Sequence, residues 1–303
     1  MRHREPVADG PGWAAVIAES VPGASVRGVS RVGGGVVAET FAVDTSDGGV
    51  IVKRYPRRRS TTVQNEWERL SFAQRMDVPV PRPLALDAEG RWFGMPALAM
   101  TRLDGSPDVS PSNVDGWLQE LASALAAIHA TDTAGAGGAL LRKSAVETWR
   151  PPKPRRPSTL VDHTVAAIQC HLPNVSWQPV LIHGDFHPGN TLWNDGKLTG
   201  IADWCESRLG PAAYELAYCR ADVALLLDRE AADRLTDHYV TAGGATPQDL
   251  PVFDLVCGLD ALRKSARMLT AYRQQGRTDS PRQFADRASA FLRHTLAELG
   301  APC

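Results

Sequence analysis

The sequence predicts an α+β protein with two lobes, a small N-terminal lobe built on an antiparallel β-sheet with one helix and a larger, mainly helical C-terminal lobe. Short β-rich runs separated by glycine turns fill most of the first hundred residues. After Asp104-Gly105, apolar residues recur at helical spacing, most clearly over 113–131. We therefore place the lobes at residues 1–103 and 104–303 and expect a ligand to bind in a cleft between them.

The elements of the first lobe follow from these runs. Strands are predicted over 29–32, 36–43 and 50–55, and the first two are joined by a glycine turn at Gly33-Gly34-Gly35. A helix over 61–75 has an apolar stripe and ends before a proline-rich extended segment, and further strands are predicted over 91–95 and 97–103.

In the second lobe, the strand over 180–182 is followed by a hairpin with a tight turn at Asn194-Asp195-Gly196. The stretch 149–158 is basic and proline-rich, which predicts an extended connector. Helices are predicted over 113–131, 160–171, 212–228, 230–242, 250–275 and 281–299.

The bulk composition excludes several classes of protein. The chain has 303 residues, 33 Lys and Arg against 34 Asp and Glu, and a net charge of −1, whereas duplex-binding proteins usually carry a basic excess. No apolar run approaches the roughly 20 residues of a membrane span, and the N-terminus lacks the apolar core of a secretory signal. We expect a cytoplasmic protein that binds no nucleic acid or membrane and has no obligate protein partner.

The strongest chemical signal is the run 181–190, which contains Asp185 and Asn190, followed by Asp203 after the hairpin. Phosphoryl transfer from a nucleotide needs these groups. One carboxylate orients the acceptor hydroxyl and takes its proton, while an amide oxygen and a second carboxylate hold Mg²⁺. Each residue alone also fits a turn or a strand end. Together they predict an ATP-dependent kinase with Asp185 as base and with Asn190 and Asp203 as magnesium ligands.

Two charged residues of the first lobe extend this interpretation. Lys53 ends an apolar strand, and Glu66 shares the inward face of the following helix. A lysine held by a carboxylate contacts the α- and β-phosphates of a nucleotide. Backbone amides of Gly33, Gly34 and Gly35 are candidates to cover the phosphates, although a flexible turn explains these glycines equally well.

Two other classes of function stay open. His183 and His187 flank Asp185, which makes a metal-dependent hydrolase a rival interpretation. Metal sites usually need three or more suitable ligands, and we expect both rings to bind backbone instead. A nucleotide-binding pseudokinase is the other alternative, although the intact set of charged residues argues against it.

The runs 183–190 and 201–204 resemble the signature of the aminoglycoside phosphotransferase family, which has a protein-kinase-like fold. By that resemblance, the stretch 100–105 is the hinge whose backbone binds adenine, so Met100 and Arg102 join the predicted ATP site. The resemblance also implies an acidic residue after Gly210, where this chain has Pro211, and a tryptophan, Trp204, follows the metal aspartate instead of Phe-Gly.

The resemblance makes an aminoglycoside-type antibiotic the first expectation for the phosphate acceptor and antibiotic resistance the expected role. A metabolite alcohol, a sugar or an amino-alcohol similar to choline or homoserine is the alternative. Acidic side chains would favour the first class, and aromatic side chains would stack on a sugar or a quaternary amine. The candidate residues are Glu206, Asp222, Asp228, Asp260, Trp193, Trp204 and Tyr218.

Overall fold

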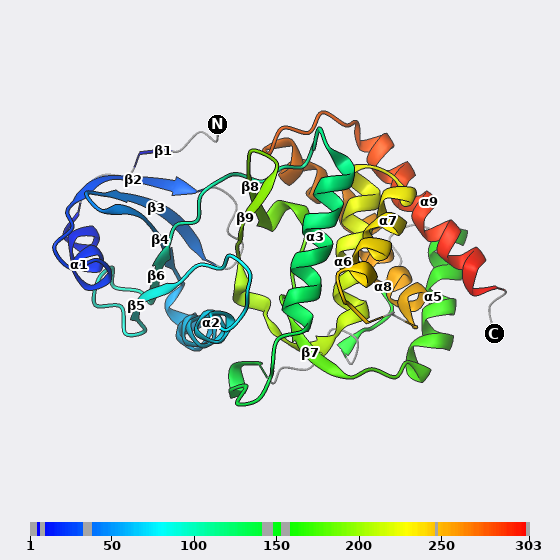
Figure 1. Cartoon of the computed structure of the whole chain (residues 1–303), viewed down its shortest axis with the longest axis horizontal. Coiled ribbons are helices and arrows are strands. Elements are labelled where there is room, and N and C mark those ends of the chain that lie inside the picture. The colour runs from blue at the N-terminus through cyan, green and yellow to red at the C-terminus, as the bar shows by residue number, and fades with distance from the viewer. Residues whose placement is uncertain are drawn as a thin grey trace. The chain divides into compact units, whose positions relative to one another are not determined.

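The computed structural model describes residues 5–6, 10–32, 38–140, 148–152, 158–245 and 248–300. The chain divides into two compact units (Figure 1). The first unit comprises Met1–Arg75, Pro79–Asp104 and Gly200–Cys205, and the second comprises Met76–Val78, Gly105–Thr199 and Glu206–Cys303. The first unit is mainly β-sheet and the second mainly helical, which confirms the predicted α+β class.

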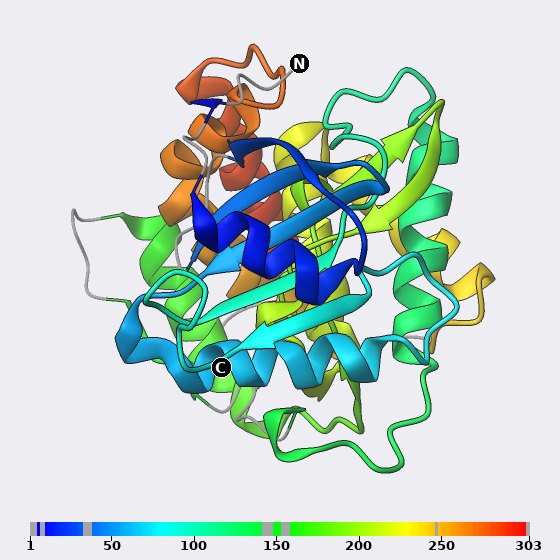
Figure 2. The same cartoon turned by 90° about the vertical axis from the view of Figure 1, so that its left-hand side faces the viewer.

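The first unit is built on an antiparallel sheet of six strands in the order β1-β2-β3-β4-β6-β5. The strands are β1 (Glu5–Pro6), β2 (Val26–Val32), β3 (Glu39–Thr45), β4 (Gly48–Arg54), β5 (Pro83–Asp87) and β6 (Ala97–Thr101). Helix α1 (Pro11–Ser20) lies across one face of this sheet, and α2 (Ser60–Ala73) runs beside β5 (Figure 2).

The core of the first unit forms because alternate strand residues face α1. Val43 and Val52 are fully buried there, together with Val16 of the helix. The ring of Trp13 meets that of Phe41 edge-on at 5.0 Å between centroids. This packing fixes β4 in the middle of the sheet and thereby the position of Lys53 near its end.

Several features of the first unit differ from the predictions, and strands β1 and β5 are among them because neither was predicted as a strand. Helix α1 was not predicted, and the strand predicted over 91–95 is wrong because this stretch forms a turn. The carboxylate of Asp87 accepts hydrogen bonds from the backbone N–H groups of Gly90 (2.9 Å) and Trp92 (2.7 Å). An aspartate that bonds to the backbone ahead of it favours a turn, and Gly90 adopts the positive φ of 84° that the turn requires.

The second unit contains α3 (Val114–His129), α5 (Thr159–His171), α6 (Ala212–Leu226), α7 (Arg229–Thr241), α8 (Leu250–Arg273) and α9 (Pro281–Leu299). These helices confirm the predicted ones to within a few residues at each end. Helix α8 packs against α6 and α9, and α3 packs against α7. One core cluster joins α5, α8 and α9 through Ile168, Leu255 and Leu292, which are all fully buried.

Short strands flank the loop that contains Asp185 and Asn190. Strand β7 (Pro179–Ile182) pairs antiparallel with β10 (Arg208–Pro211), which was not predicted. Strands β8 (Thr191–Asn194) and β9 (Lys197–Ile201) form the predicted hairpin. Asp195 and Gly196 in its turn have φ values of 49° and 76°, as a two-residue type I′ turn requires.

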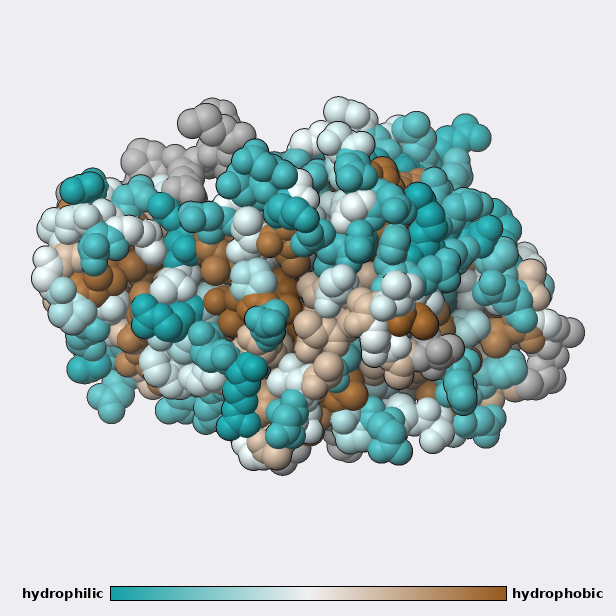
Figure 3. All heavy atoms as spheres, viewed as in Figure 1, coloured by the Kyte–Doolittle hydropathy of each residue, from teal (hydrophilic) through white to brown (hydrophobic). Residues whose placement is uncertain are grey.

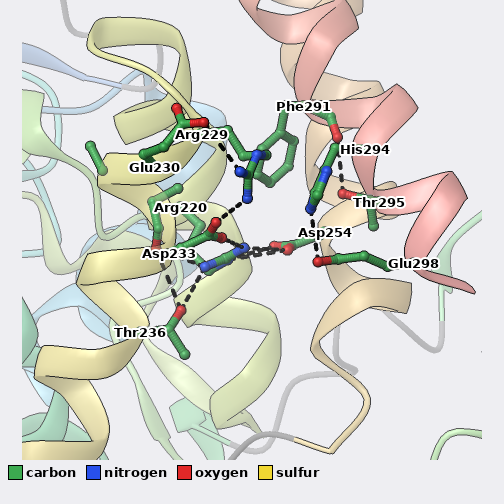
Figure 4. A network of polar contacts seen from close by, with 12 residues as sticks. Arg220, Arg229, Glu230, Asp233, Thr236, Asp254, Phe291, His294, Thr295 and Glu298 are labelled. Atoms are coloured by element: carbon green, nitrogen blue, oxygen red, sulfur yellow. Dashed lines mark hydrogen bonds and ion pairs between the residues drawn. The ribbon is translucent and has the colours of Figure 1, made fainter.

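A buried guanidinium links three helices of the second unit (Figure 4). Arg220 of α6 donates to both carboxylate oxygens of Asp254 on α8 at distances between 2.9 and 3.1 Å. It also donates to Ala232 O (2.7 Å), Thr236 Oγ1 (2.6 Å) and Asp233 Oδ1 (3.1 Å) on α7. These bonds fix α6, which carries Tyr218, against α7 and α8.

The surface is mixed in character. Val240 is the one large hydrophobic side chain recorded as exposed among the described residues. The face drawn in Figure 3 shows hydrophilic residues interspersed with smaller apolar areas. Within the described ranges, no helix combines the length and apolar character that crossing a membrane requires.

Candidate functional site

The loop that follows β7 is shaped by a glycine. Gly184 has φ of +82°, and a Cβ atom there would lie 2.3 Å from the carbonyl oxygen of Glu206. No other residue type fits this close approach without moving the backbone. The pairing of β7 with β10 holds the two backbone segments at this distance, and Ser207 Oγ donates to Ile182 O at 3.0 Å. Gly184 thus lets the loop turn sharply just before Asp185.

The buried carboxylate of Glu215 holds the start of the same loop. Glu215 of α6 accepts hydrogen bonds from the backbone N–H groups of His183 (2.9 Å) and Gly184, and its Oε2 lies 3.1 Å from His129 Nε2. Burial alone would raise the pKa of Glu215, but His129, His183 and the N–H of Gly184 together outweigh burial and lower that pKa. Glu215 is therefore ionised and fixes the start of the loop. Its role was missed because no local sequence pattern links α6 to a loop about thirty residues earlier.

Both carboxylate oxygens of Asp185 are oriented by neighbouring side chains of the second unit. Tyr218 donates its hydroxyl to Oδ1 at 2.7 Å, and Asn190 donates its amide to Oδ2 at 3.1 Å. The same amide group donates to the backbone oxygen of Asp185 at 3.0 Å. Asp185 remains about one third exposed, so each oxygen keeps a lone pair for a ligand. This geometry suits a base that must accept a proton from a bound hydroxyl.

The two histidines of the motif bind backbone, as expected. Nδ1 of His183 accepts from the N–H of Asp185 at 3.3 Å, and Nδ1 of His187 accepts from the N–H of Gly189 at 3.1 Å. Among the described residues, no three His, Cys, Asp or Glu side chains are grouped as metal ligands. The rings therefore pin the loop, and the geometry gives no support to the metal-dependent hydrolase.

The first unit brings Lys53 together with Glu66 and Asp203. Lys53 Nζ lies 2.6 Å from Glu66 Oε1 and 2.8 Å from Asp203 Oδ1. Burial of the ammonium group opposes its charge, but Asp203 and Glu66 outweigh burial and raise the pKa of Lys53 well above its usual value. Glu66 is only 1% exposed and also accepts from the hydroxyl of Tyr55. Glu66 thus points inward as predicted, while the contribution of Tyr55 was missed.

Lys53→Met is expected to weaken Mg·ATP binding by about tenfold or more, equivalent to about 1.4 kcal/mol, because it removes the ammonium group that Glu66 and Asp203 hold in place. Isothermal titration calorimetry with Mg·AMP-PNP measures this affinity. Lys197→Met removes a lysine that is 78% exposed and serves as the matched control. Equal affinity in wild type and Lys53→Met would remove Lys53 from the nucleotide site.

Asp203 adopts an unusual backbone conformation. Its φ is +68°, a left-handed value that costs free energy for a residue other than glycine. The carboxylate is 44% exposed and its Oδ1 accepts from Lys53. Strained residues of this kind concentrate at functional sites, where the surrounding structure holds them in place.

Other predicted nucleotide contacts are only partly described. Gly33, Gly34 and Gly35 lie outside the described residues. Met100 is buried in β6 between β4 and β5. The N–H of Arg102 donates to Gly49 O at 3.1 Å, and its guanidinium pairs with Asp44 at 2.6 Å. These contacts use the Arg102 amide within the sheet, and an adenine-binding role for the hinge stays a prediction.

The donor set fits a hard divalent cation. Asn190 uses its amide nitrogen to hold Asp185, which leaves its Oδ1 without a hydrogen bond among the described residues. Mg²⁺ prefers such oxygen atoms and is commonly held by one or two protein groups together with phosphate oxygens. Asn190 lies in the second unit and Asp203 in the first, so their joint role as ligands stays a prediction.

A cavity of the second unit is lined in part by Tyr218, whose hydroxyl bonds to Asp185. Its walls include the aromatic rings of Trp149, Tyr214 and Tyr218. Polar groups line it as well, namely Arg150, Asp260 and Arg263. A molecule in this cavity would contact Tyr218, the residue whose hydroxyl bonds to the candidate base. The cavity is the candidate acceptor site.

Few of the side chains proposed from sequence for acceptor binding line this cavity. Trp193 and Trp204 are buried, and their indole N–H groups bond to Thr191 Oγ1 and Ile201 O, each at 2.9 Å. Asp228 caps α7 by accepting from Ala231 N at 2.8 Å. Among the proposed acids and aromatics, the cavity lining includes Asp260 and Tyr218.

Comparison with known proteins places these features in a family. Residues 28–256 match the model of the phosphotransferase enzyme family. The uncharacterized protein YcbJ of Bacillus subtilis (strain 168) is 28% identical over 148 residues. That match spans 43% of this chain and 44% of YcbJ, so it covers less than half of the relative's length.

Solved structures match over nearly the whole chain. Aminoglycoside phosphotransferase APH(4)-Ia is 18% identical with a TM-score of 0.64, and the match covers 95% of this chain and 97% of that protein. A macrolide 2′-phosphotransferase type I is 18% identical with a TM-score of 0.60, over 92% and 95% of the two chains. At this identity the likeness concerns the fold, and it confirms the predicted protein-kinase-like fold.

Proposed function

Because the chain belongs to the phosphotransferase enzyme family, we propose that it transfers the γ-phosphoryl group of ATP to a hydroxyl group of a small molecule. The observation that carries this proposal is the orientation of Asp185. Tyr218 and Asn190 hold one carboxylate oxygen each, and Tyr218 also lines the candidate acceptor cavity.

The reaction follows from the chemistry of these residues. The acceptor oxygen forms a bond to the γ-phosphorus while the bond from that phosphorus to the bridging oxygen breaks, which releases ADP. Asp185 accepts the proton of the acceptor hydroxyl. Lys53, held by Glu66, binds the α- and β-phosphates. Mg²⁺, when bound near Asn190 and Asp203, supplies charge neutralisation at the phosphates.

Relatives of similar fold support a nucleotide donor and a small-molecule acceptor. APH(4)-Ia has been solved in ternary complexes with ADP or AMP-PNP and hygromycin B, and APH(2″)-IIIa in a complex with GDP and kanamycin. These complexes favour an aminoglycoside acceptor by analogy. The alternative is a metabolite alcohol, and the charges of the acceptor cavity bear on this choice. The cytoplasm is the compartment that fits an ATP-dependent enzyme, and this location stays a prediction.

The proposal is tested by mass spectrometry of reaction mixtures that contain the protein, Mg·ATP and a panel of hydroxyl compounds. The panel contains aminoglycosides, macrolides, choline, homoserine, sugars and hydroxy acids. We expect one class to gain the mass of a phosphoryl group with release of an equal amount of ADP. A protein that binds no Mg·ATP in a parallel titration contradicts the proposal. Binding without any product favours the pseudokinase.

Asp203→Asn is expected to remove most of the magnesium dependence of nucleotide binding. The substitution keeps the size of the side chain but removes the charge that attracts the cation. We expect Mg²⁺ to strengthen ATP binding to the wild type by at least about tenfold (about 1.4 kcal/mol) and to leave the variant nearly unaffected. Titrations with and without EDTA measure this difference. Asp195→Asn, at another aspartate with positive φ, is the matched control, and an unchanged magnesium effect in Asp203→Asn would remove the metal role.

A further inference from the structure

The charges at the acceptor cavity are predominantly positive. Arg150 and Arg263 both line it, and neither guanidinium forms an ion pair with another described residue. Asp260 is the single acid in the lining, and Lys264 pairs with its Oδ2 at 2.6 Å. The cavity therefore presents two guanidinium groups without an ion pair among the described residues, of which Arg150 donates to Trp149 O at 2.7 Å, and one carboxylate that is paired with Lys264.

Acids near the cavity are already engaged by other groups. Asp185 accepts from Tyr218 and Asn190. Asp222 is buried, accepts the hydroxyl of Tyr272, and lies 3.4 Å from His187 Nδ1. The described lining offers a polycation only the carboxylate of Asp260, whereas burying several ammonium groups requires matching carboxylates.

The sequence around the cavity residues also has a positive net charge. Residues 142–156 contain six Lys or Arg and one Glu. Trp149, Arg150 and Pro152, which line the cavity, belong to this stretch. Arg150 is the basic residue of this stretch that the structure describes, and its charge, with that of Arg263, attracts anionic ligands to the cavity.

The apolar walls of the cavity indicate what the uncharged part of its ligand is like. The rings of Tyr214 and Tyr218 lie 6.5 Å apart at an angle of 35°, and Trp149 also lines the cavity. Val256 and Leu259 add aliphatic surface. Aromatic and aliphatic walls favour a flat or apolar body, while the arginines hold a planar anion through paired N–H groups.

We propose that the phosphate acceptor is a hydroxy acid, with an anionic group at Arg150 and Arg263, an apolar or aromatic body against Tyr214 and Tyr218, and its hydroxyl at Asp185. This inference rests on the proposed function and replaces the expectation of an aminoglycoside acceptor. The anionic group is a carboxylate or a similar planar anion, since guanidinium binds such groups through two parallel hydrogen bonds.

The test compares acids with their neutral amides in the presence of Mg·AMP-PNP. Mandelate and phenyllactate are titrated calorimetrically against mandelamide and phenyllactamide, and kanamycin is titrated as a polycation. We expect each acid to bind at least tenfold more tightly than its amide and more tightly than kanamycin. The preference should shrink as NaCl is raised, because the arginines are exposed and salt screens their charge.

Variants of Arg150 and Arg263 test whether these two residues cause the preference for acids. The double variant Arg150→Ala/Arg263→Ala should lose the preference for the acids, while affinity for the amides stays unchanged. Arg267→Ala removes the same charge from an exposed position of α8 outside the lining and is the matched control.

Three results overturn the inference and leave the kinase proposal intact. They are equal or undetectable binding of acids and amides, an acid preference that survives in the double variant, and phosphorylation of kanamycin. Failure of the wild type to bind Mg·AMP-PNP, which is measured first on the same sample, would instead contradict the proposed function.

Discussion

Asp185→Asn is expected to reduce the rate of phosphoryl transfer by about 10²–10⁴-fold and to leave the affinity for Mg·ATP unchanged. The amide has the size of the carboxylate, so the loop keeps its shape, but it cannot take the proton of the acceptor. The carboxylate holds no group of the first unit in place, because its described partners are Tyr218, Asn190 and His187 of the second unit. Single-turnover measurements of ADP formation isolate the chemical step.

Tyr218→Phe is the control for this experiment. It removes the hydroxyl that bonds to Asp185 Oδ1 but leaves the carboxylate and the aromatic wall in place. We expect a much smaller loss of rate than for Asp185→Asn. Transfer at the wild-type rate in Asp185→Asn would show that another group accepts the proton, or that none is needed.

Asp254→Ala is expected to lower the free energy of unfolding by about 3–5 kcal/mol, because it leaves the guanidinium of Arg220 buried with too few acceptors. The side chains of Arg220 and Asp254 are only 7% and 2% exposed. The remaining acidic partner, Asp233, is 41% exposed and bonds to one nitrogen (Figure 4). Urea unfolding followed by circular dichroism measures the change.

Two further variants identify the cause. Asp233→Ala breaks the exposed contact and should cost at most about 1 kcal/mol. Replacing both partners, Arg220→Met with Asp254→Leu, should recover much of the stability because no charge is then left buried. If Asp254→Ala destabilises the protein no more than Asp233→Ala does, the buried pair does not hold the three helices together.

The sequence predicted the fold well where periodic patterns are long. The helix predicted over 113–131 has apolar residues at sustained helical spacing, and the structure shows it over Val114–His129. Short elements were missed because they depend on contacts with other parts of the folded chain rather than on a local sequence pattern. Strand β10 exists only by pairing with β7, and the turn after Asp87 depends on side-chain bonds to backbone N–H groups. Hydrophobic content alone therefore gave a wrong strand over 91–95.

At the candidate site, the chemical roles of single residues could be predicted from the sequence, but most contacts between residues far apart in the chain could not. The ion pair between Lys53 and Glu66 was predicted because the strand and the helix face placed both residues inward. Tyr218 and Glu215 were missed as partners of the Asp185 loop, since both come from α6, which follows the motif in the chain. A single sequence holds no signal that a helix turns back onto an earlier loop.

The first unit is assembled from discontinuous segments of the chain, and this has a consequence for its synthesis on the ribosome. Residues Gly200–Cys205 belong to this unit, Trp204 is fully buried there, and the N–H of Ile201 donates to Pro79 O at 2.9 Å. A nascent chain that ends near residue 104 lacks these contacts, and its Lys53 lacks Asp203. At about 5–20 residues per second, the missing segment emerges roughly 5–20 s later. The first unit therefore completes its packing only after much of the second has been made, and a fragment of residues 1–104 is not a faithful substitute for it.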